Sequence, residues 1–211
     1  MADSPLDQLV ESFRKFPGIG PRQARRFVYY LLRANHGTVE TLVKQIKDLK
    51  ASIAQCPDCF RFYPLTFRAK AGDPCPICRD TSRDASELMI IEKDLDLENI
   101  ERTDTYRGYY FVLGGLIPIL EKEPERRVRL RELEAVVARR RAGGLKEVIL
   151  ALSANPEGDY TSQYLRRFLS PDVASLLPEF KISTLGRGLS TGTELEYSDA
   201  DTLKNALRHR D

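Results

Sequence analysis

The segment from Leu9 to Leu32 has the strongest pattern in the sequence: two amphipathic helical stretches that meet at the Pro-Gly-Ile-Gly-Pro run of residues 17–21. Gly18 and Gly20 flank a single apolar residue, Ile19, which is the pattern of a helix-hairpin-helix motif. Glycine lets the backbone turn tightly and lets a phosphate approach without meeting a Cβ atom. The unpaired N–H groups at the start of the second helix also attract an anion. The hairpin therefore predicts contact with phosphate.

Positive charge is concentrated around this hairpin. The net charge of the chain is only +2, yet no acidic residue lies between Glu11 and Glu40. The cations in that stretch are Arg14, Lys15, Arg22, Arg25, Arg26 and Arg33. A solvated basic helix face is the simple interpretation, but the glycine hairpin in the same place favours DNA. Because phosphate contacts carry no base information, we expect binding without base specificity, through Gly18, Gly20, Arg22 and Arg26.

Local signals predict the ends of the other N-terminal helices. Ser4 can cap a first helix that begins at Pro5, with Asp7 placed to complete a capping box. Thr38 and Thr41 are expected to open a third helix.

Four cysteines form two C-x-x-C knuckles separated by fifteen residues: Cys56, Cys59, Cys75 and Cys78. Each knuckle presents two thiolates from one tight turn, and two knuckles complete a tetrahedron around Zn²⁺. The alternative, a redox dithiol, needs one such motif at a helix start. We therefore expect one structural zinc ion with no open coordination position. The two histidines, His36 and His209, lie far from the knuckles in sequence and are expected at the surface.

After the cysteines, strands and helices alternate. The predicted strands are Glu87–Glu92, Tyr106–Gly115, Glu147–Leu152 and Lys181–Thr184. The predicted helices between and around them are Asp94–Arg102, Glu125–Arg141 and Thr161–Leu169, with a loop at Pro171–Pro178. This alternation predicts a mostly parallel sheet covered on both faces.

The expected fold is thus a multidomain α/β protein. Its expected parts are a helix-hairpin-helix DNA-binding domain (1–54), a C4-type zinc finger (55–80), a Toprim-like domain (87–184) and a C-terminal glycine-rich tail with a helix (185–211).

Acidic residues lie at the carboxyl ends of two predicted strands: Glu92 is the last residue of the first, and Glu157 and Asp159 come after the strand EVILAL. Carboxylates at neighbouring strand ends can hold Mg²⁺ for phosphoryl chemistry, as in the Toprim fold that this layout resembles. Catalytic Toprim proteins place an Asp-x-Asp pair after the later strand, whereas this chain has Ser-Ala-Asn at residues 153–155. A non-enzymatic DNA-binding protein is therefore favoured over the alternative, a Mg²⁺-dependent nuclease or topoisomerase-like enzyme.

Composition excludes several other classes. Hydrophobic residues at 42% and charged residues at 30% are typical of a globular domain rather than a disordered one. The sequence has no apolar run long enough to span a membrane and no secretory signal, so we expect a cytoplasmic protein without membrane contact.

Four stretches in the right order resemble the RecR family of bacterial recombination mediators over nearly the whole chain. They are FPGIGPRQARRF, TYRGYYFVLGGLI, the Glu157–Thr161 segment EGDYT, read as a turn, and GLSTGTELEYSDADTLKNAL.

The resemblance implies a non-enzymatic protein that assembles as a ring-like homotetramer. It implies that the protein acts with RecO, and with RecF, to load RecA onto gapped DNA coated with single-strand-binding protein. Arg22 and Arg26 match hairpin positions where the family places DNA-contacting cations. Glu157–Thr161 and Glu194–Tyr197 match surfaces used for partners and subunit contacts.

Two stretches depart from the family pattern. The span between the knuckles is longer and interleaves aromatic and basic residues: Arg61, Phe62, Tyr63, Phe67, Arg68 and Lys70. Such residues can stack on single-stranded DNA, but a longer β-hairpin is the interpretation we favour. The helix ERRVRLRELEAVVARRRAGG is richer in arginine than the family pattern, which is consistent with either an extended basic surface or a solvated helix.

Overall fold

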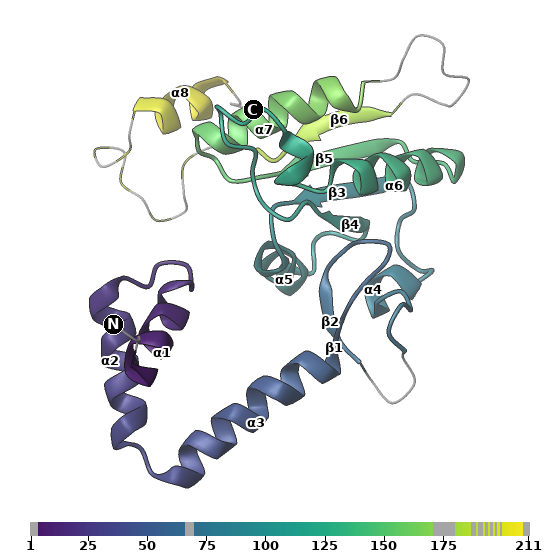
Figure 1. Ribbon diagram of the computed structural model, residues 1–211. Coiled ribbons are helices and arrows are strands. Elements are labelled where there is room, and N and C mark those ends of the chain that lie inside the picture. The colour runs from purple at the N-terminus through teal and green to yellow at the C-terminus, as the bar shows by residue number, and fades with distance from the viewer. Residues whose placement is uncertain are drawn as a thin grey trace. The chain divides into compact units, whose positions relative to one another are not determined.

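The computed structural model describes residues 4–65, 70–170, 180–186, 189, 192, 194, 196, 198 and 200–208. The chain divides into two compact units, Met1–Ile53 and Ala54–Asp211 (Figure 1).

The first unit consists of three helices, α1 (Pro5–Arg14), α2 (Pro21–Arg33) and α3 (His36–Ser52). Its core is small because it rests on α1 and α2 alone. The buried side chains are Val10, Ala24 and Val28, and Leu6, Phe13 and Ile19 pack against them.

Helix caps explain where these helices begin. Ser4 accepts a hydrogen bond from the backbone N–H of Asp7 and thereby caps α1, as predicted. The prediction for α3 was wrong by two residues. Asn35 accepts from the N–H of Thr38 at 2.8 Å, so the helix starts at His36 rather than at Thr38.

The second unit is built on a parallel sheet of four strands in the order β4-β3-β5-β6. The strands are β3 (Glu87–Ile91), β4 (Tyr109–Val112), β5 (Glu147–Ala151) and β6 (Lys181–Thr184). The predicted parallel α/β sheet is therefore confirmed. In this register the carboxyl ends of the strands meet at one edge, where Ile91 lies between Val112 and Ala151.

Each face of the sheet has its own core, and different elements cover the two faces (Figure 1). On one face, Leu88, Ile90 and Phe111 pack with side chains of α6 (Leu130–Ala142) and α7 (Pro156–Phe168). On the other face, strand side chains pack with α5 (Asp94–Thr103) and with the cysteine segment. The members of this second core are Cys56, Cys59, Tyr63, Cys75, Ile77, Met89, Ile91, Leu97, Tyr110, Val112 and Ala151. The cysteine segment thus shares a hydrophobic core with the sheet.

Two predicted elements are shorter than expected. The strand predicted from Tyr106 to Gly115 is confined to Tyr109–Val112, because Gly114 and Gly115 adopt positive φ and end the extended backbone. The helix predicted from Glu125 is split into a 3-10 turn, Pro124–Arg126, and α6.

Two arginine contacts explain the split. The backbone N–H of Arg129 donates to the Leu113 carbonyl at 3.0 Å. The side chain of Arg129 donates to the Val112 carbonyl at 2.8 Å. Both hydrogen bonds tie this residue to the end of β4 and pull its backbone out of the helix (φ −81°, ψ 64°).

One helix is longer than predicted. We expected a helix from Thr161, but α7 begins at Pro156, because Asn155 accepts from the N–H of Gly158 and caps it. The segment Glu157–Thr161 is therefore the start of a helix and not a turn, which corrects the motif that we took for one.

The C-terminal helix α8 spans Ala200–Arg208. The loop at Pro171–Pro178, the histidine at 209, and Phe67, Arg68, Leu195 and Tyr197 lie outside the described residues. Among the described residues, no helix has the length and apolar character needed to cross a bilayer.

Candidate nucleic-acid interface and metal centre

The hairpin between α1 and α2 turns at Gly18. Its φ of +74° lies in the left-handed region that favours glycine. The next residue, Ile19, donates its N–H to the Phe16 carbonyl at 3.2 Å and packs against the core of the unit. Ile19 therefore anchors the turn, and the residues on either side of it are exposed.

The start of α2 has no side-chain cap. Gly20 occupies the N-cap position, Pro21 follows it, and no side chain accepts from the first-turn N–H groups. By contrast, Ser4 caps α1 and Asn35 caps α3. A Cβ built on Gly20 would meet no atom within 4 Å, so the space in front of these amides is open. An uncapped helix start without an acidic first turn is suited to an anion.

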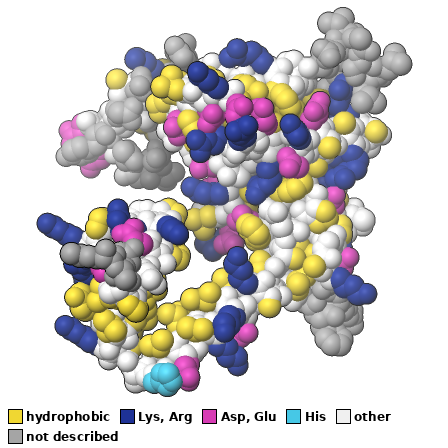
Figure 2. All heavy atoms as spheres, in the orientation of Figure 1, with side chains coloured by type: hydrophobic (Ala, Val, Ile, Leu, Met, Phe, Trp, Pro, Cys, Tyr) yellow, Lys and Arg dark blue, Asp and Glu magenta, His cyan; other side chains and the backbone are white. Residues whose placement is uncertain are grey.

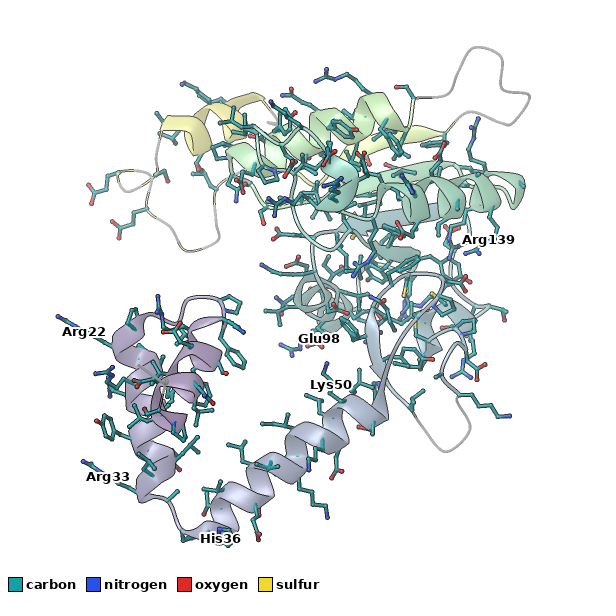
Figure 3. The ribbon with its side chains drawn as sticks, viewed as in Figure 1. Arg22, Arg33, His36, Lys50, Glu98 and Arg139 are labelled. Atoms are coloured by element: carbon teal, nitrogen blue, oxygen red, sulfur yellow. The ribbon has the colours of Figure 1, made fainter. Side chains whose placement is uncertain are left out.

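Three exposed arginines of α2 form no ion pair with any described residue: Arg22, Arg26 and Arg33. The labelled Arg22 and Arg33 project from the same side of the helix in Figure 3. Of the neighbouring cations, Arg14 pairs with Glu11 at 2.6 Å, and Arg25 lies 3.9 Å from Asp7. The charges of Arg22 and Arg26 are therefore available beside the open amides.

The four cysteines of the two knuckles meet at one point. Their sulfur atoms all lie within 4.8 Å of one another. Cys56, Cys59 and Cys75 are buried, and Cys78 is half-buried. The N–H of Cys75 donates to the sulfur of Cys56 at 3.2 Å, the kind of backbone contact that stabilises a thiolate. This donor set can bind a metal ion tetrahedrally.

The close approach of the thiols makes them titrate unequally. The hydrogen bond with Cys59 lowers the pKa of Cys56, and the same bond raises the pKa of Cys59. Hydrogen bonds with the other three thiols raise the pKa of Cys78. The four thiols thus differ in how readily each loses its proton. A divalent cation removes this difference, because it stabilises all four groups as thiolates.

A small hairpin of β1 (Ile53–Gln55) and β2 (Phe62–Pro64) supports the first knuckle. Tyr63 is only 2% exposed, and its hydroxyl donates to the Asp73 carbonyl at 2.6 Å. This tyrosine therefore holds the inter-knuckle span together and is not available to stack on a base. The neighbouring Phe62 is exposed.

The carboxyl edge of the sheet contains Glu92, whose side chain is 16% exposed. Ser153, directly beyond β5, donates its hydroxyl to Oε2 of Glu92 at 2.6 Å. The position next to Glu92 is thus occupied by a hydroxyl and not by a second carboxylate. Among the residues that the structure describes, the four cysteines are the one group of three or more potential ligands close enough to share a metal ion.

Two residues of the Glu157–Thr161 segment have structural roles. A Cβ on Gly158 would overlap the carbonyl oxygen of Ser153, so only glycine lets α7 start this close to the end of β5. The hydroxyl of Thr161, fully buried, accepts from the N–H of Ile117 and fixes the loop after β4. Glu157 is exposed and Asp159 is half-buried, both on the first turn of α7.

Sequence reasoning missed two residues of this edge, Ser153 and Arg129. Nothing in the sequence showed that Arg129 would pack against Gly114 at the end of β4. Ser153 was noted only as a departure from Asp-x-Asp, and its hydrogen bond to Glu92 depends on the pairing of β3 with β5.

Comparisons with known proteins agree with this arrangement. Residues 6–50 match the family model "RecR, helix-hairpin-helix", and residues 86–178 match the Toprim domain model. Recombination protein RecR of Chloroflexus aggregans is 39% identical over 207 residues, which cover 98% of this chain and 93% of that protein. RecR of a Dehalococcoides mccartyi strain is 38% identical over 97% of this chain and 93% of its own length. RecR of a Synechococcus strain is 37% identical over 100% and 98%.

The fold and the site together define a Toprim protein with an N-terminal helix-hairpin-helix module and a four-cysteine cluster that can bind a metal ion. The extent and level of identity are sufficient to place it more narrowly. The chain belongs to the RecR family of recombination proteins.

Proposed function

We propose that this protein is a non-enzymatic mediator of recombinational DNA repair in the cytoplasm. In this proposal it binds gapped or single-stranded regions of DNA without base specificity. It acts there with RecO, and with RecF, to load RecA. Membership in the RecR family supports the recombination role, and the hairpin supports the contact with DNA.

The observation that carries the proposal is the uncapped start of α2 beside unpaired arginines. The open first-turn amides at Gly20 and the charges of Arg22 and Arg26 lie on one helix end. Such groups bind phosphate oxygens and release condensed counterions, and they read no base edges. The expected ligand is therefore the sugar–phosphate backbone.

We propose that the metal of the four-cysteine cluster is one structural Zn²⁺. Four thiolates leave no position for water or substrate, which is the arrangement of structural rather than catalytic zinc. The role of the metal in this proposal is to stabilise the fold of the second unit.

The absence of catalysis is part of the proposal. A two-metal mechanism requires several carboxylates around the phosphoryl group. Here the side chain of Glu92 contacts the hydroxyl of Ser153 and lies 3.6 Å from the ammonium of Lys93. We propose that two acidic surfaces bind protein partners and do not carry out phosphoryl chemistry. They are the Toprim surface of Glu92, Glu157 and Asp159 and the tail at Glu194 and Glu196.

A homotetramer is the proposed assembly. None of the seventeen residues of α3 is buried, although one face of the helix is apolar. Figure 2 shows apolar side chains gathered along this helix. The exposed apolar residues of α3 are Leu42, Val43, Ile46 and Leu49. A second copy of the chain would cover this face, since exposed apolar surface of this extent marks an interaction site.

Replacement of Arg22 and Arg26 by Glu tests the DNA interface. We expect affinity for a labelled gapped duplex to fall by roughly tenfold or more in low salt, and the slope of log K against log[salt] to decrease by about two. Fluorescence anisotropy at several salt concentrations measures both quantities.

The matched control is the pair Lys44→Glu and Lys47→Glu on α3, which changes the net charge of the same unit equally. Equal losses in the two double variants would show a nonspecific charge effect and would reject the hairpin as the DNA-binding surface.

A further inference from the structure

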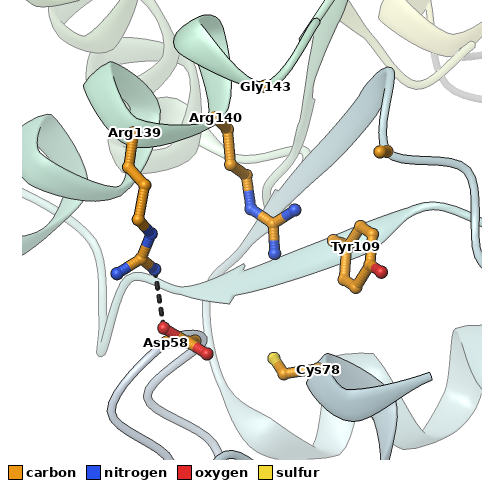
Figure 4. A pocket seen from close by; sticks show the side chains of 7 residues that line it. Asp58, Cys78, Tyr109, Arg139, Arg140 and Gly143 are labelled. Carbon is orange, nitrogen blue, oxygen red and sulfur yellow. Dashed lines mark hydrogen bonds and ion pairs between the residues drawn. The ribbon is translucent and has the colours of Figure 1, made fainter. Parts of the chain in front are cut away.

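A small pocket lies beside the second cysteine knuckle, entirely within the second unit. Its volume is about 240 Å³. It is lined by Asp58, Cys78, Ala85, Tyr109, Arg139, Arg140 and Gly143. Figure 4 shows that two arginine side chains extend from the end of α6 into it.

The two arginines differ in what they contact. Arg139 pairs with Asp58, with 2.6 Å between Nη2 and Oδ1. The guanidinium of Arg140 lies 4.0 Å from the centre of the Tyr109 ring, and its Nε is buried without a hydrogen-bond partner. No described residue supplies Arg140 with a carboxylate. The pocket therefore holds two guanidinium groups, the carboxylate of Asp58 and the sulfur of Cys78, which is a metal-bound thiolate in the proposed zinc cluster.

The position of these arginines at a helix end does not by itself explain why Arg139 and Arg140 both extend into the pocket. Cations at a helix C-terminus complement the helix dipole, and Arg139, Arg140 and Arg141 all occupy the last turn of α6. The backbone carbonyl of Arg140 is already satisfied by the N–H groups of Gly143 and Leu145. Arg141 turns away, with its guanidinium over the ring of Phe180. Only Arg139 and Arg140 converge on the pocket.

We propose that this pocket binds one phosphate group of a nucleic-acid strand. A volume of 240 Å³ is below the usual range of about 300–1,000 Å³ for pockets that hold whole small molecules, so it suits a single anionic group. Guanidinium groups bind phosphate with two parallel hydrogen bonds. The stacking of Arg140 on Tyr109 holds its donors in place before the phosphate arrives, which reduces the entropy lost on binding.

The site adds a second phosphate contact, on a different unit from the hairpin. It rests on the proposed DNA binding only for the source of the phosphate. The two arginines have one alternative role, which is to neutralise the negative charge of the Cys78 thiolate in the metal cluster. That role predicts a change in metal content when the charge is removed.

The test compares Arg140→Gln with Arg131→Gln, an exposed arginine of the same helix that does not line the pocket. Both are made in the full-length protein. Binding of a single-stranded oligonucleotide is measured over a range of salt, orthophosphate binding is measured by calorimetry, and metal content is determined on each sample. We expect Arg140→Gln to weaken oligonucleotide binding several-fold, to reduce the salt slope by about one and to abolish orthophosphate binding. Arg131→Gln should leave orthophosphate binding intact.

The other outcomes are also decisive. If Arg140→Gln abolishes orthophosphate binding but leaves oligonucleotide binding unchanged, the phosphate that the pocket binds does not belong to a nucleic-acid strand. If Arg140→Gln lowers the metal content but leaves the binding of both ligands unchanged, the pocket is not a phosphate site and its arginines neutralise the Cys78 thiolate. If the wild type binds no oligonucleotide, the proposed function fails, whereas the orthophosphate measurement still decides the pocket. Should Arg140→Gln not fold, Arg139→Gln, at a side chain 58% exposed, serves the same comparison.

Discussion

At the scale of single residues, Gly158 determines how closely α7 approaches the end of β5. The backbone carbonyl of Ser153 occupies the space where a side chain at residue 158 would lie. The close approach also places Asn155 where it can cap the helix and Thr161 where it can hold the loop at Ile117. The absence of a side chain at residue 158 thus lets α7 begin directly beyond β5.

This geometry gives Gly158→Ala the opposite effect to its helix propensity. Alanine favours a helix interior by up to about 1 kcal/mol over glycine, but the overlap with Ser153 forces the backbone to shift. We expect a net loss of about 1–3 kcal/mol in the free energy of unfolding, as for other overpacked sites. Urea denaturation followed by circular dichroism measures it.

Gly37→Ala is the matched control, because Gly37 lies in the first turn of α3 and a Cβ there would meet its nearest atom at 3.5 Å. That substitution should be neutral or stabilising. A stability gain at both positions would contradict the overlap at Gly158.

At the scale of elements, the cysteine segment and the sheet depend on each other. The N–H of Val112, the last residue of β4, donates to the carbonyl of Cys59 at 2.8 Å. Tyr63 and Ile77 of the segment share a core with Met89 of β3. A metal ion that fixes the knuckles therefore also fixes one face of the sheet.

Removal of the metal with a strong chelator should accordingly loosen β4 as well as the knuckles. Structural zinc contributes on the order of 10 kcal/mol to the folding of small metal-binding units, so, with the Zn²⁺ proposed above, its loss is expected to remove most protection of the Val112 amide. Hydrogen–deuterium exchange with mass spectrometry measures this effect. The amides of α1 and α2 provide the internal control and should exchange at unchanged rates. Unchanged protection throughout β4 would show that the segment and the sheet are uncoupled.

The elements also show which predictions a sequence can support. The meeting of the four cysteines, the turn at Gly18 and the Ser4 cap were predicted correctly, because each depends on a local sequence motif. The break before α6 was missed, because Arg129 is pulled out of the helix by the Val112 carbonyl, seventeen positions earlier. The early start of α7 was missed because the segment EGDYT was read as a turn from the family resemblance, whereas Gly158 allows close packing against Ser153.

At the scale of the whole molecule, the first unit has too small a hydrophobic core to bury all of its own apolar side chains. Among the described residues its core consists of three buried side chains, and the apolar face of α3 contributes none of them. The exposed fractions along that face run from 39% at Leu42 to 59% at Leu49. The sequence predicted this helix, but a local pattern does not show whether the same chain or another covers its apolar face.

The variant Ile46→Asp tests whether another copy covers this face. A charge placed in an apolar interface is costly, so we expect the apparent dissociation constant of the assembly to rise by about 100-fold or more. Light scattering coupled to size-exclusion chromatography over a range of concentrations measures it. Lys47→Asp, at an adjacent exposed position, controls for added negative charge. An assembly of the same size in both variants would exclude α3 as the subunit interface.

The hydrogen bond between Val112 and Cys59 also has a consequence for biosynthesis. The knuckles precede the sheet along the chain, so a newly made polypeptide can load its metal before the strands emerge. If the metal is the zinc proposed above, then in a zinc-starved cell the strands would form beside a cysteine segment whose two knuckles are not joined by a metal ion. The yield of mature protein, and with it the capacity for repair, would then follow the supply of the metal.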